Sequence, residues 1–159
     1  MSDERHIAFL RQAIRIATQN VESGEGGPFG AVVVREGRVL ATGVNRVTAM
    51  NDPTAHAEMM AMREACRILG DFKLTGCEIY CSSEPCPMCL AAIYWARAER
   101  IYYAATRVEA VAVGFDDQFI HDEMAMDIAG RSIPAQRLLA EEALTPFEHW
   151  TAQQGRVHY

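Results

Sequence analysis

Three residues of this chain have the types and the spacing of zinc ligands: His56, Cys86 and Cys89. His56 belongs to the motif H-A-E at 56–58, and the cysteines belong to the motif P-C-P-M-C at 85–89. An imidazole and two thiolates are ligands that Zn²⁺ prefers, and three protein ligands leave the fourth tetrahedral position open for a water. A structural zinc site is normally closed by a fourth protein ligand. The two motifs therefore predict one catalytic zinc ion (Zn2+) per chain.

Glu58 stands two residues after His56 and is predicted to act beside the metal, not on it. Two residues correspond to about 200° around a helix, so the two side chains can converge only beyond a helix end. The sequence N-D-P-T at 51–54 is a turn and cap signal before the periodic stretch 55–69. We therefore expect His56 and Glu58 in the first turn of a helix, with Glu58 as the catalytic carboxylate that moves a proton from the activated water.

The cysteine motif has the signals of a second helix start. Pro85 and Pro87 bracket Cys86, and proline is favoured at the first position of a helix. Cys86 and Cys89 are spaced i, i+3 and so fall on one helical face. Helix N-termini carry partial positive charge, which favours thiolates and a deprotonated metal-bound water. Two helix starts are thus predicted to point at one metal ion.

The combination H-x-E with P-C-x-x-C is the signature of zinc-dependent nucleobase deaminases. The alternative is that His56, Cys86 and Cys89 are core residues, or a folding zinc site completed by Cys77 or Cys81. A purely structural site requires neither a carboxylate two residues after the histidine nor the helix-start signals. The motif therefore favours hydrolytic deamination.

The order of elements predicts an α/β fold in one domain, 1–159. Ligand sites in such folds lie beyond the carboxyl ends of strands, where helices begin, and both motifs lie at such points. The predicted elements are a helix opening near 2–4 with Ile7, Leu10, Ile14, Ala17 and Val21 on its apolar face, a hairpin of 31–34 and 39–44, a helix to 69, a strand at 78–82, a helix from 86, a strand at 100–105 and a helix after 107.

Composition argues against a nucleic-acid partner. The formal net charge is −6, and the chain has one lysine, Lys73. Binding to a phosphate backbone depends on lysine and arginine, and no basic run is evident, so a small neutral substrate is favoured. No segment reaches the ~18 apolar residues of a membrane span. We therefore expect no membrane association. Five cysteines in a chain without a leader-like segment indicate metal ligands and reduced thiols, so we expect a cytoplasmic location.

Longer strings give the chain a more specific likeness. It resembles the small bacterial guanine deaminases of the cytidine-deaminase-like superfamily over nearly its whole length. The strings that carry the resemblance are G-G-P-F-G-A at 26–31, N-D-P-T-A-H-A-E at 51–58, E-P-C-P-M-C at 84–89, A-I-Y-W-A at 92–96 and G-F-D-D at 114–117.

The resemblance implies a three-layer α/β/α architecture around a central mixed sheet of five strands. It also implies a homodimer whose C-terminal segment 146–159 is exchanged between subunits. Within a purine-binding site, Asn45 would hydrogen-bond the base, Phe29 and Trp95 would wall the pocket, Ala57 would contact the substrate, Asp117 would bind the guanine edge and assist proton transfer, and Tyr159 would close the site from the partner subunit.

Residue types alone leave other readings of these positions open. Asn45 is also suited to end a strand, Phe29 to plug a hydrophobic core and Trp95 to pack in one. Asp117 resembles a residue of a solvated loop, and Tyr159 alone would read as part of a frayed terminus. Their roles at a site therefore rest on the resemblance.

The resulting hypothesis is hydrolytic deamination of guanine to xanthine and ammonia. The zinc-activated water would attack C2 of the purine while Glu58 carries the proton. One alternative is a deaminase of another small aminated ring, such as guanosine, cytosine or an aminotriazine, because pocket shape selects the ring. The others are a tRNA adenosine deaminase, which would need a basic face, and a zinc-stabilised binding protein without catalysis.

Overall fold

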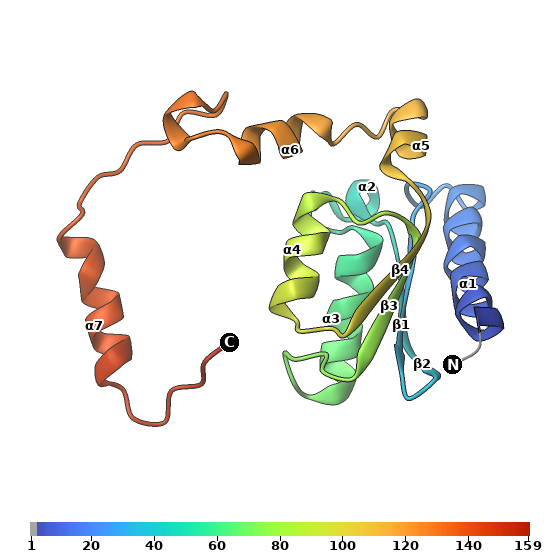
Figure 1. The fold of residues 1–159 in the computed structure, drawn as a ribbon, viewed down its shortest axis with the longest axis horizontal. Helices are drawn as coiled ribbons and strands as arrows, with labels where there is room; N and C mark the ends of the chain where they lie inside the picture. The colour runs from blue at the N-terminus through green and yellow to red at the C-terminus, as the bar shows by residue number, and fades with distance from the viewer. Residues whose placement is uncertain (1–2) are drawn as a thin grey trace. The chain divides into compact units, whose positions relative to one another are not determined.

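The computed structural model describes residues 3–159 and divides into two compact units at Asp117 and Gln118. Figure 1 shows the elements of both. The first unit contains α1 (Asp3–Glu22), β1 (Gly30–Arg35), β2 (Arg38–Val44), α2 (Val47–Met50), α3 (Ala57–Leu69), β3 (Cys77–Ser83), α4 (Pro87–Trp95), β4 (Arg100–Ala105) and α5 (Arg107–Ala112). The second contains α6 (Gln118–Ala125), two short 3₁₀ turns at Ile128–Gly130 and Glu142–Leu144, and α7 (Thr145–Ala152).

The sheet is mixed, with the strand order β2-β1-β3-β4. β1 is antiparallel to β2 and to β3, and β4 is parallel to β3 across the α4 connection. The predicted hairpin and the predicted parallel pair are confirmed. The expected fifth strand is wrong for the described residues, whose sheet has four strands. After β4 the chain forms helices and then an irregular segment around Gly130 and Pro134, residue types that interrupt a strand ladder.

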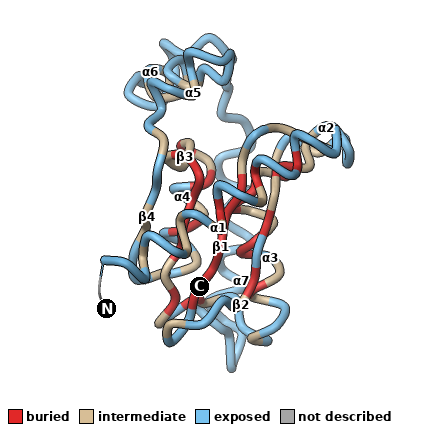
Figure 2. Tube along the Cα trace, turned by 90° about the vertical axis from the view of Figure 1, so that its right-hand side faces the viewer, coloured by how far each residue is buried: buried red, intermediate tan, exposed pale blue. Residues whose placement is uncertain are grey.

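Helices cover both faces of the sheet and give the predicted three layers. α1 lies on one face, while α3 and α4 lie on the other (Figure 1). Ala31 and Val33 of β1 belong to the core beneath α3, whereas Val32 and Val34 belong to the core beneath α1. All four are fully buried, and Figure 2 shows the buried positions along β1. A strand covered on both faces is expected to read as a continuous apolar run, as this one does.

Small residues bring α1 close to β1. A Cβ added at Gly30 would lie 2.4 Å from the carbonyl oxygen of Ala13, so only glycine fits there. The buried residues of α1 are Ala13, Ala17 and Asn20. The predicted apolar face is therefore only partly correct, because close packing selects small side chains. Of the larger predicted residues, three remain exposed: Ile7, Ile14 and Val21. The helix is described from Asp3, within the predicted opening near 2–4, and Ser2 lies outside the described residues.

On the opposite face, α3 approaches the backbone of β2 just as closely. A Cβ added at Gly43 would lie 2.3 Å from the carbonyl oxygen of Ala57 and 2.4 Å from the amide nitrogen of Ala61. Ala57 is the first residue of α3 and is completely buried. The N-terminal turn of α3 therefore rests on the backbone of β2, which fixes the position of the residues around it.

The second unit has a different character. None of residues 118–159, all of which the structure describes, is buried. Large apolar side chains there are largely exposed, including Ile133 at 80%, Leu138 at 68% and Phe147 at 67%. Such a segment lacks a core of its own and needs another surface to cover it. No helix in the described residues 3–159 combines the length and apolar character needed to cross a membrane.

Candidate metal centre

The metal-binding motifs lie at the starts of α3 and α4. His56 is the N-cap residue of α3 and Cys86 is the N-cap residue of α4, and both have extended backbone angles. The structure thus moves His56 from the predicted first turn to the position just before it. Pro87 occupies the start of α4, as predicted. Both helices begin at the same end of the sheet (Figure 1), and neither N-cap side chain caps its own helix.

The three predicted ligands form one cluster. Nδ1 of His56 lies 3.5 Å from Sγ of Cys86 and 3.6 Å from Sγ of Cys89. The three potential ligand atoms all lie within 4.8 Å of one another. A tetrahedral zinc ion with usual Zn–N and Zn–S bond lengths separates such atoms by roughly 3.5 Å. The arrangement therefore fits zinc with three protein ligands.

Hydrogen bonds among the two cysteines and the histidine shift the pKa values of all three side chains. A hydrogen bond from the Cys89 thiol lowers the pKa of Cys86 to about 4, and the same interaction raises the pKa of Cys89. A hydrogen bond with Cys86 raises the pKa of His56. The site thus already stabilises one thiolate, which is the form that a zinc ion binds.

Glu58 lies next to this cluster without belonging to it. It sits in the first turn of α3, and only 6% of its surface is exposed. Burial raises the pKa of its carboxyl, and a hydrogen bond with Cys89 opposes that shift. A carboxyl with a raised pKa is suited to accept and release a proton near neutral pH. Burial also raises the pKa of Cys81, a core thiol of β3, and Glu58 adds to that shift.

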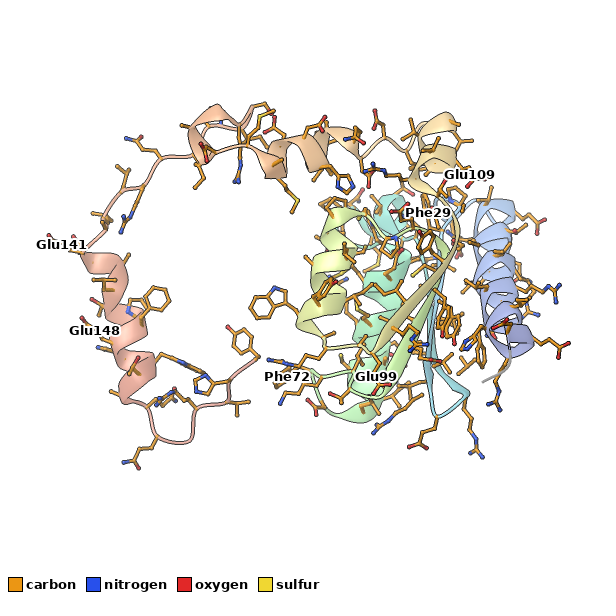
Figure 3. The ribbon with its side chains drawn as sticks, in the orientation of Figure 1. Phe29, Phe72, Glu99, Glu109, Glu141 and Glu148 are labelled. Atoms are coloured by element: carbon orange, nitrogen blue, oxygen red, sulfur yellow. The ribbon has the colours of Figure 1, made fainter. Side chains whose placement is uncertain are left out.

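Phe29 and Asn45 are joined through their backbones beside β1 and β2. The amide of Asn45 donates to the carbonyl of Phe29 at 3.1 Å. Asn45 is buried, and its side-chain Oδ1 accepts from the amide of Val47. The ring of Phe29, labelled in Figure 3, meets that of Phe115 edge-on at a centroid distance of 4.8 Å. The sequence reasoning gave Phe115 no role, although it follows Gly114 within a string that it had singled out.

A further hydrogen bond connects this region to the metal ligands. The amide of Arg46 donates to the carbonyl of Ala55 at 2.9 Å. Ala55 immediately precedes His56 and is completely buried. The strand end that carries Asn45 is therefore anchored to the segment that carries the histidine ligand.

Three other predicted site residues lie apart from the cluster or in the second unit. Trp95 is the last residue of α4 and is 63% exposed. Trp95 follows Cys89 by six positions, a rise of about 9 Å along the helix axis, so Cys89 lies in the first turn of α4 and Trp95 at its end. Asp117, the last residue of the first unit, is partly buried. Tyr159 ends the second unit with 71% of its surface exposed. The roles of all three stay predictions.

Asn20 is a residue of this region that the sequence reasoning missed. It lies on α1 with 4% of its surface exposed, and its amide nitrogen contacts both the glycine-rich loop and the end of β2. With Ala13 and Ala17 it forms an i, i+4, i+7 line, and the structure shows that this line is the buried face of α1. A polar residue on such a line indicates a specific buried hydrogen bond.

Residues 3–105, which hold all three metal ligands and Glu58, match the family described as the cytidine and deoxycytidylate deaminase zinc-binding region. The chain belongs to this deaminase family. It is a zinc-dependent aminohydrolase, and the cluster of His56, Cys86 and Cys89 is its candidate zinc-binding site.

Relatives with solved structures extend the likeness of this deaminase beyond the zinc region. Guanine deaminase of Bacillus subtilis (strain 168) is 49% identical over 154 residues, covering 97% of this chain and 99% of that protein. The X-ray structure of guanine deaminase from Bacillus subtilis has a TM-score of 0.95 at 46% identity, covering 100% of this chain and 99% of that one. It confirms the cytidine-deaminase-like fold.

A second group of relatives matches a shorter part of the deaminase. A tRNA-specific adenosine deaminase of Aquifex aeolicus (strain VF5) is 45% identical over 97 residues, covering 61% of this chain and 64% of that protein. The likeness to this protein therefore leaves more than a third of the chain unmatched.

Proposed function

We propose that this deaminase converts guanine and water to xanthine and ammonia. The observation that carries the proposal is the likeness to a guanine deaminase over 97% of the chain. That span includes residues beyond the zinc region at 3–105. Since the zinc motif is shared by deaminases of several rings, the parts outside the motif carry the information about the substrate.

The side chains around the zinc site would have two roles, metal binding and proton transfer. When bound, the zinc ion supplies an activated water by lowering the pKa of that water to about 7. Glu58 would take one proton of the water and deliver it to a ring nitrogen, and would then pass the second proton, from the hydroxyl added at C2, to the amine, which leaves as ammonia. Its burial supports this role because water competes little for a buried carboxyl. His56 and the two cysteines would hold the ion at two helix starts and leave one position for the water.

Recognition of the base would fall to Asn45, Phe29 and Asp117. The amide group of Asn45 can donate to an acceptor of the purine, while the Phe29 ring would lie against its plane. A carboxylate such as Asp117 suits the donor edge of guanine at N1 and the 2-amino group, whereas adenine has no donor at N1. Trp95 and Tyr159 would complete the pocket, and Ala57 would contact the ring beside the zinc site.

Deamination of tRNA adenosine is the second candidate, because the tRNA deaminases share up to 49% identity with part of this chain. The net charge of −6 and the single lysine oppose it. An RNA substrate requires cationic side chains along the backbone path. Guanine itself has no phosphate, so its binding to an acidic protein involves no electrostatic repulsion from a phosphate backbone.

We further propose that the enzyme is a homodimer in which segment 146–159 crosses to the partner subunit. Its aromatic side chains support the proposal, since Phe147 is 67% exposed and Trp150 is 38% exposed within one chain. Apolar surface of this size favours a covering partner. Exchange would also bring Tyr159 to a zinc site that lies on another chain.

The test is an assay of the zinc-loaded enzyme on guanine, guanosine, cytosine, an aminotriazine and adenosine-containing tRNA, measuring ammonia and product absorbance. Xanthine from guanine alone is the expected result. Turnover of another substrate instead would overturn guanine as the substrate while keeping the zinc chemistry. Inactivity on every substrate, together with unfolding on zinc chelation, would favour a non-catalytic zinc-stabilised protein.

A further inference from the structure

Asn20, on α1, connects two parts of the proposed substrate site, the glycine-rich loop before Phe29 and the segment that carries Asn45. Its Nδ2 donates to the carbonyl of Gly27 at 2.9 Å and to the carbonyl of Asn45 at 2.9 Å. Gly27 lies in the loop that leads to Phe29, and Asn45 directly follows the last residue of β2. One buried amide group therefore spans the loop that presents the aromatic ring and the strand end that presents the proposed purine ligand.

The surroundings of Asn20 leave little room for another arrangement. A Cβ added at Gly26 would lie 2.0 Å from the carbonyl oxygen of Asn45 and 2.9 Å from Nδ2 of Asn20. The backbone carbonyl of Asn20 also accepts bonds from the Ser23 hydroxyl at 3.0 Å and the Glu25 amide at 3.2 Å. The loop is thus held to α1 at several points, and Asn20 is where α1 contacts the end of β2.

We propose that Asn20 is a positioning residue for substrate binding, which acts with the backbone bond between Asn45 and Phe29 to hold the glycine-rich loop against the Asn45 segment. This inference rests on the proposed function. Asn20 contacts the carbonyls of the two site segments and leaves the side chains of Phe29 and Asn45 to meet the base. The zinc ligands and Glu58 are positioned by the starts of α3 and α4, to which the Asn45 segment is joined by the backbone bond from Arg46 to Ala55 and not by Asn20. Loss of the Asn20 bonds should therefore weaken substrate binding more than the chemical step.

The decisive variant is Asn20→Asp, which keeps the shape of the side chain and replaces the donor with an acceptor. Two carbonyl oxygens would then face a carboxyl oxygen, and the loop and strand end would separate. Leaving such buried groups unsatisfied typically costs enough to change binding by about tenfold or more. We expect KM for guanine to rise about tenfold, the dissociation constant of xanthine to rise equally, and kcat to change less than about threefold.

Glu25→Gln is the matched control. The Glu25 carboxylate pairs with Arg46 and so links the same loop to the same strand end, but on the surface, with the two side chains 57% and 31% exposed. Exposed ion pairs contribute little, so KM should stay within about twofold of wild type. Gly26→Ala provides a second test of the buried junction, because its methyl group would push against the carbonyl of Asn45. It should raise KM as Asn20→Asp does.

The outcomes separate this inference from the proposed function. If the wild-type enzyme does not deaminate guanine, the proposed function fails and the positioning role falls with it. If the wild type is active, and Asn20→Asp and Gly26→Ala both fold, bind zinc and keep the wild-type KM, the positioning role alone is wrong. Loss of thermal stability without a change in KM, or failure of both variants to fold, would likewise make Asn20 a purely structural residue.

Discussion

Oδ1 of Asn45 accepts a hydrogen bond from the backbone amide of Val47 at 3.2 Å. Because a backbone amide can only donate, this bond orients the Asn45 carboxamide with its oxygen toward Val47. The amide nitrogen is then the group that can reach a ligand. A residue type that could merely have ended a strand therefore presents a donor of fixed orientation.

Replacing Asn45 with aspartate should test that donor. Asn45→Asp can still accept from Val47 but cannot donate to the purine, so we expect KM for guanine to rise about tenfold to a hundredfold. Steady-state kinetics, with zinc content measured alongside, provide the check. Thr42→Ala, an exposed change in the same strand, should leave KM unaltered. An unchanged KM in Asn45→Asp would remove Asn45 from the list of substrate ligands.

Glu58→Gln should abolish turnover while zinc stays bound. The amide preserves size and hydrogen-bonding reach but cannot carry the proton, and loss of a general acid-base group typically costs about 10²- to 10⁴-fold in rate. Ammonia release and metal analysis of the same sample measure both properties. Glu64→Gln is the matched control, since Glu64 lies on the same helix, is 42% exposed and pairs with Arg67. Wild-type turnover by Glu58→Gln would contradict the proton-transfer role.

Exchange of the C-terminal segment should allow two inactive variants to complement one another. One variant carries Glu58→Gln with an intact tail, and the other lacks Tyr159 but keeps Glu58. In an exchanged heterodimer, the site with intact Glu58 receives the intact tail of its partner. Random pairing would restore about a quarter of the sites. We expect activity after co-expression of the two chains and none from either alone.

The outcome of that mixing experiment also defines where the tail acts. If the chain lacking Tyr159 is fully active by itself, Tyr159 does not close the site. If both variants are inactive and mixed dimers form without regaining activity, the tail acts within its own chain. Co-purification of differently tagged chains shows that mixed dimers have formed and keeps this second reading separate from a failure to assemble.

Tyr80 should make the fold sensitive to alkaline pH. It is fully buried, donates to Glu78 at 2.7 Å and contacts His6 at 2.7 Å. Burial, followed by the bond to Glu78, raises the pKa of Tyr80 well above its usual value of about 10. Above that pH the unfolded chain loses the proton while the folded chain keeps it. The free energy of unfolding should therefore fall as pH rises, by about 1.4 kcal/mol per pH unit.

Urea unfolding at several pH values above about 10 measures this slope. Tyr80→Phe removes the titrating group and should make the slope shallower by about 1.4 kcal/mol per pH unit. Tyr94→Phe, which alters a side chain that is 76% exposed, serves as the control and should keep the wild-type slope. An identical slope in Tyr80→Phe would show that other groups dominate the alkaline transition.

The sequence predicted the zinc ligands because their geometry is local. Each motif sits at a helix start, and the caps and prolines that set those starts lie within a few residues of His56 and Cys86. The strand β1 was equally predictable, since it has the apolar run of a strand that is buried on both faces. At the zinc motifs only the helix boundary differed, because His56 lies just before the first turn.

Asn20 could not be found in this way, because its role depends on which side of α1 faces the sheet. The large apolar residues suggested one face, whereas close contact with Gly30 brings Ala13 and Ala17 against β1. The pairing of segments far apart in sequence selects between such faces, and periodicity alone does not. The same limit applies to Tyr159, whose proposed partner belongs to another chain.

The contact of Gly43 with Ala57 gives this deaminase an engineering advantage. Backbone atoms meet there, so this contact with the start of α3 does not depend on the side chains of Phe29 or Asn45. Substitutions at Phe29 or Asn45 should thus change which ring is accepted without displacing His56 or Glu58. The scaffold is suited to libraries that vary ring recognition while the metal chemistry stays constant.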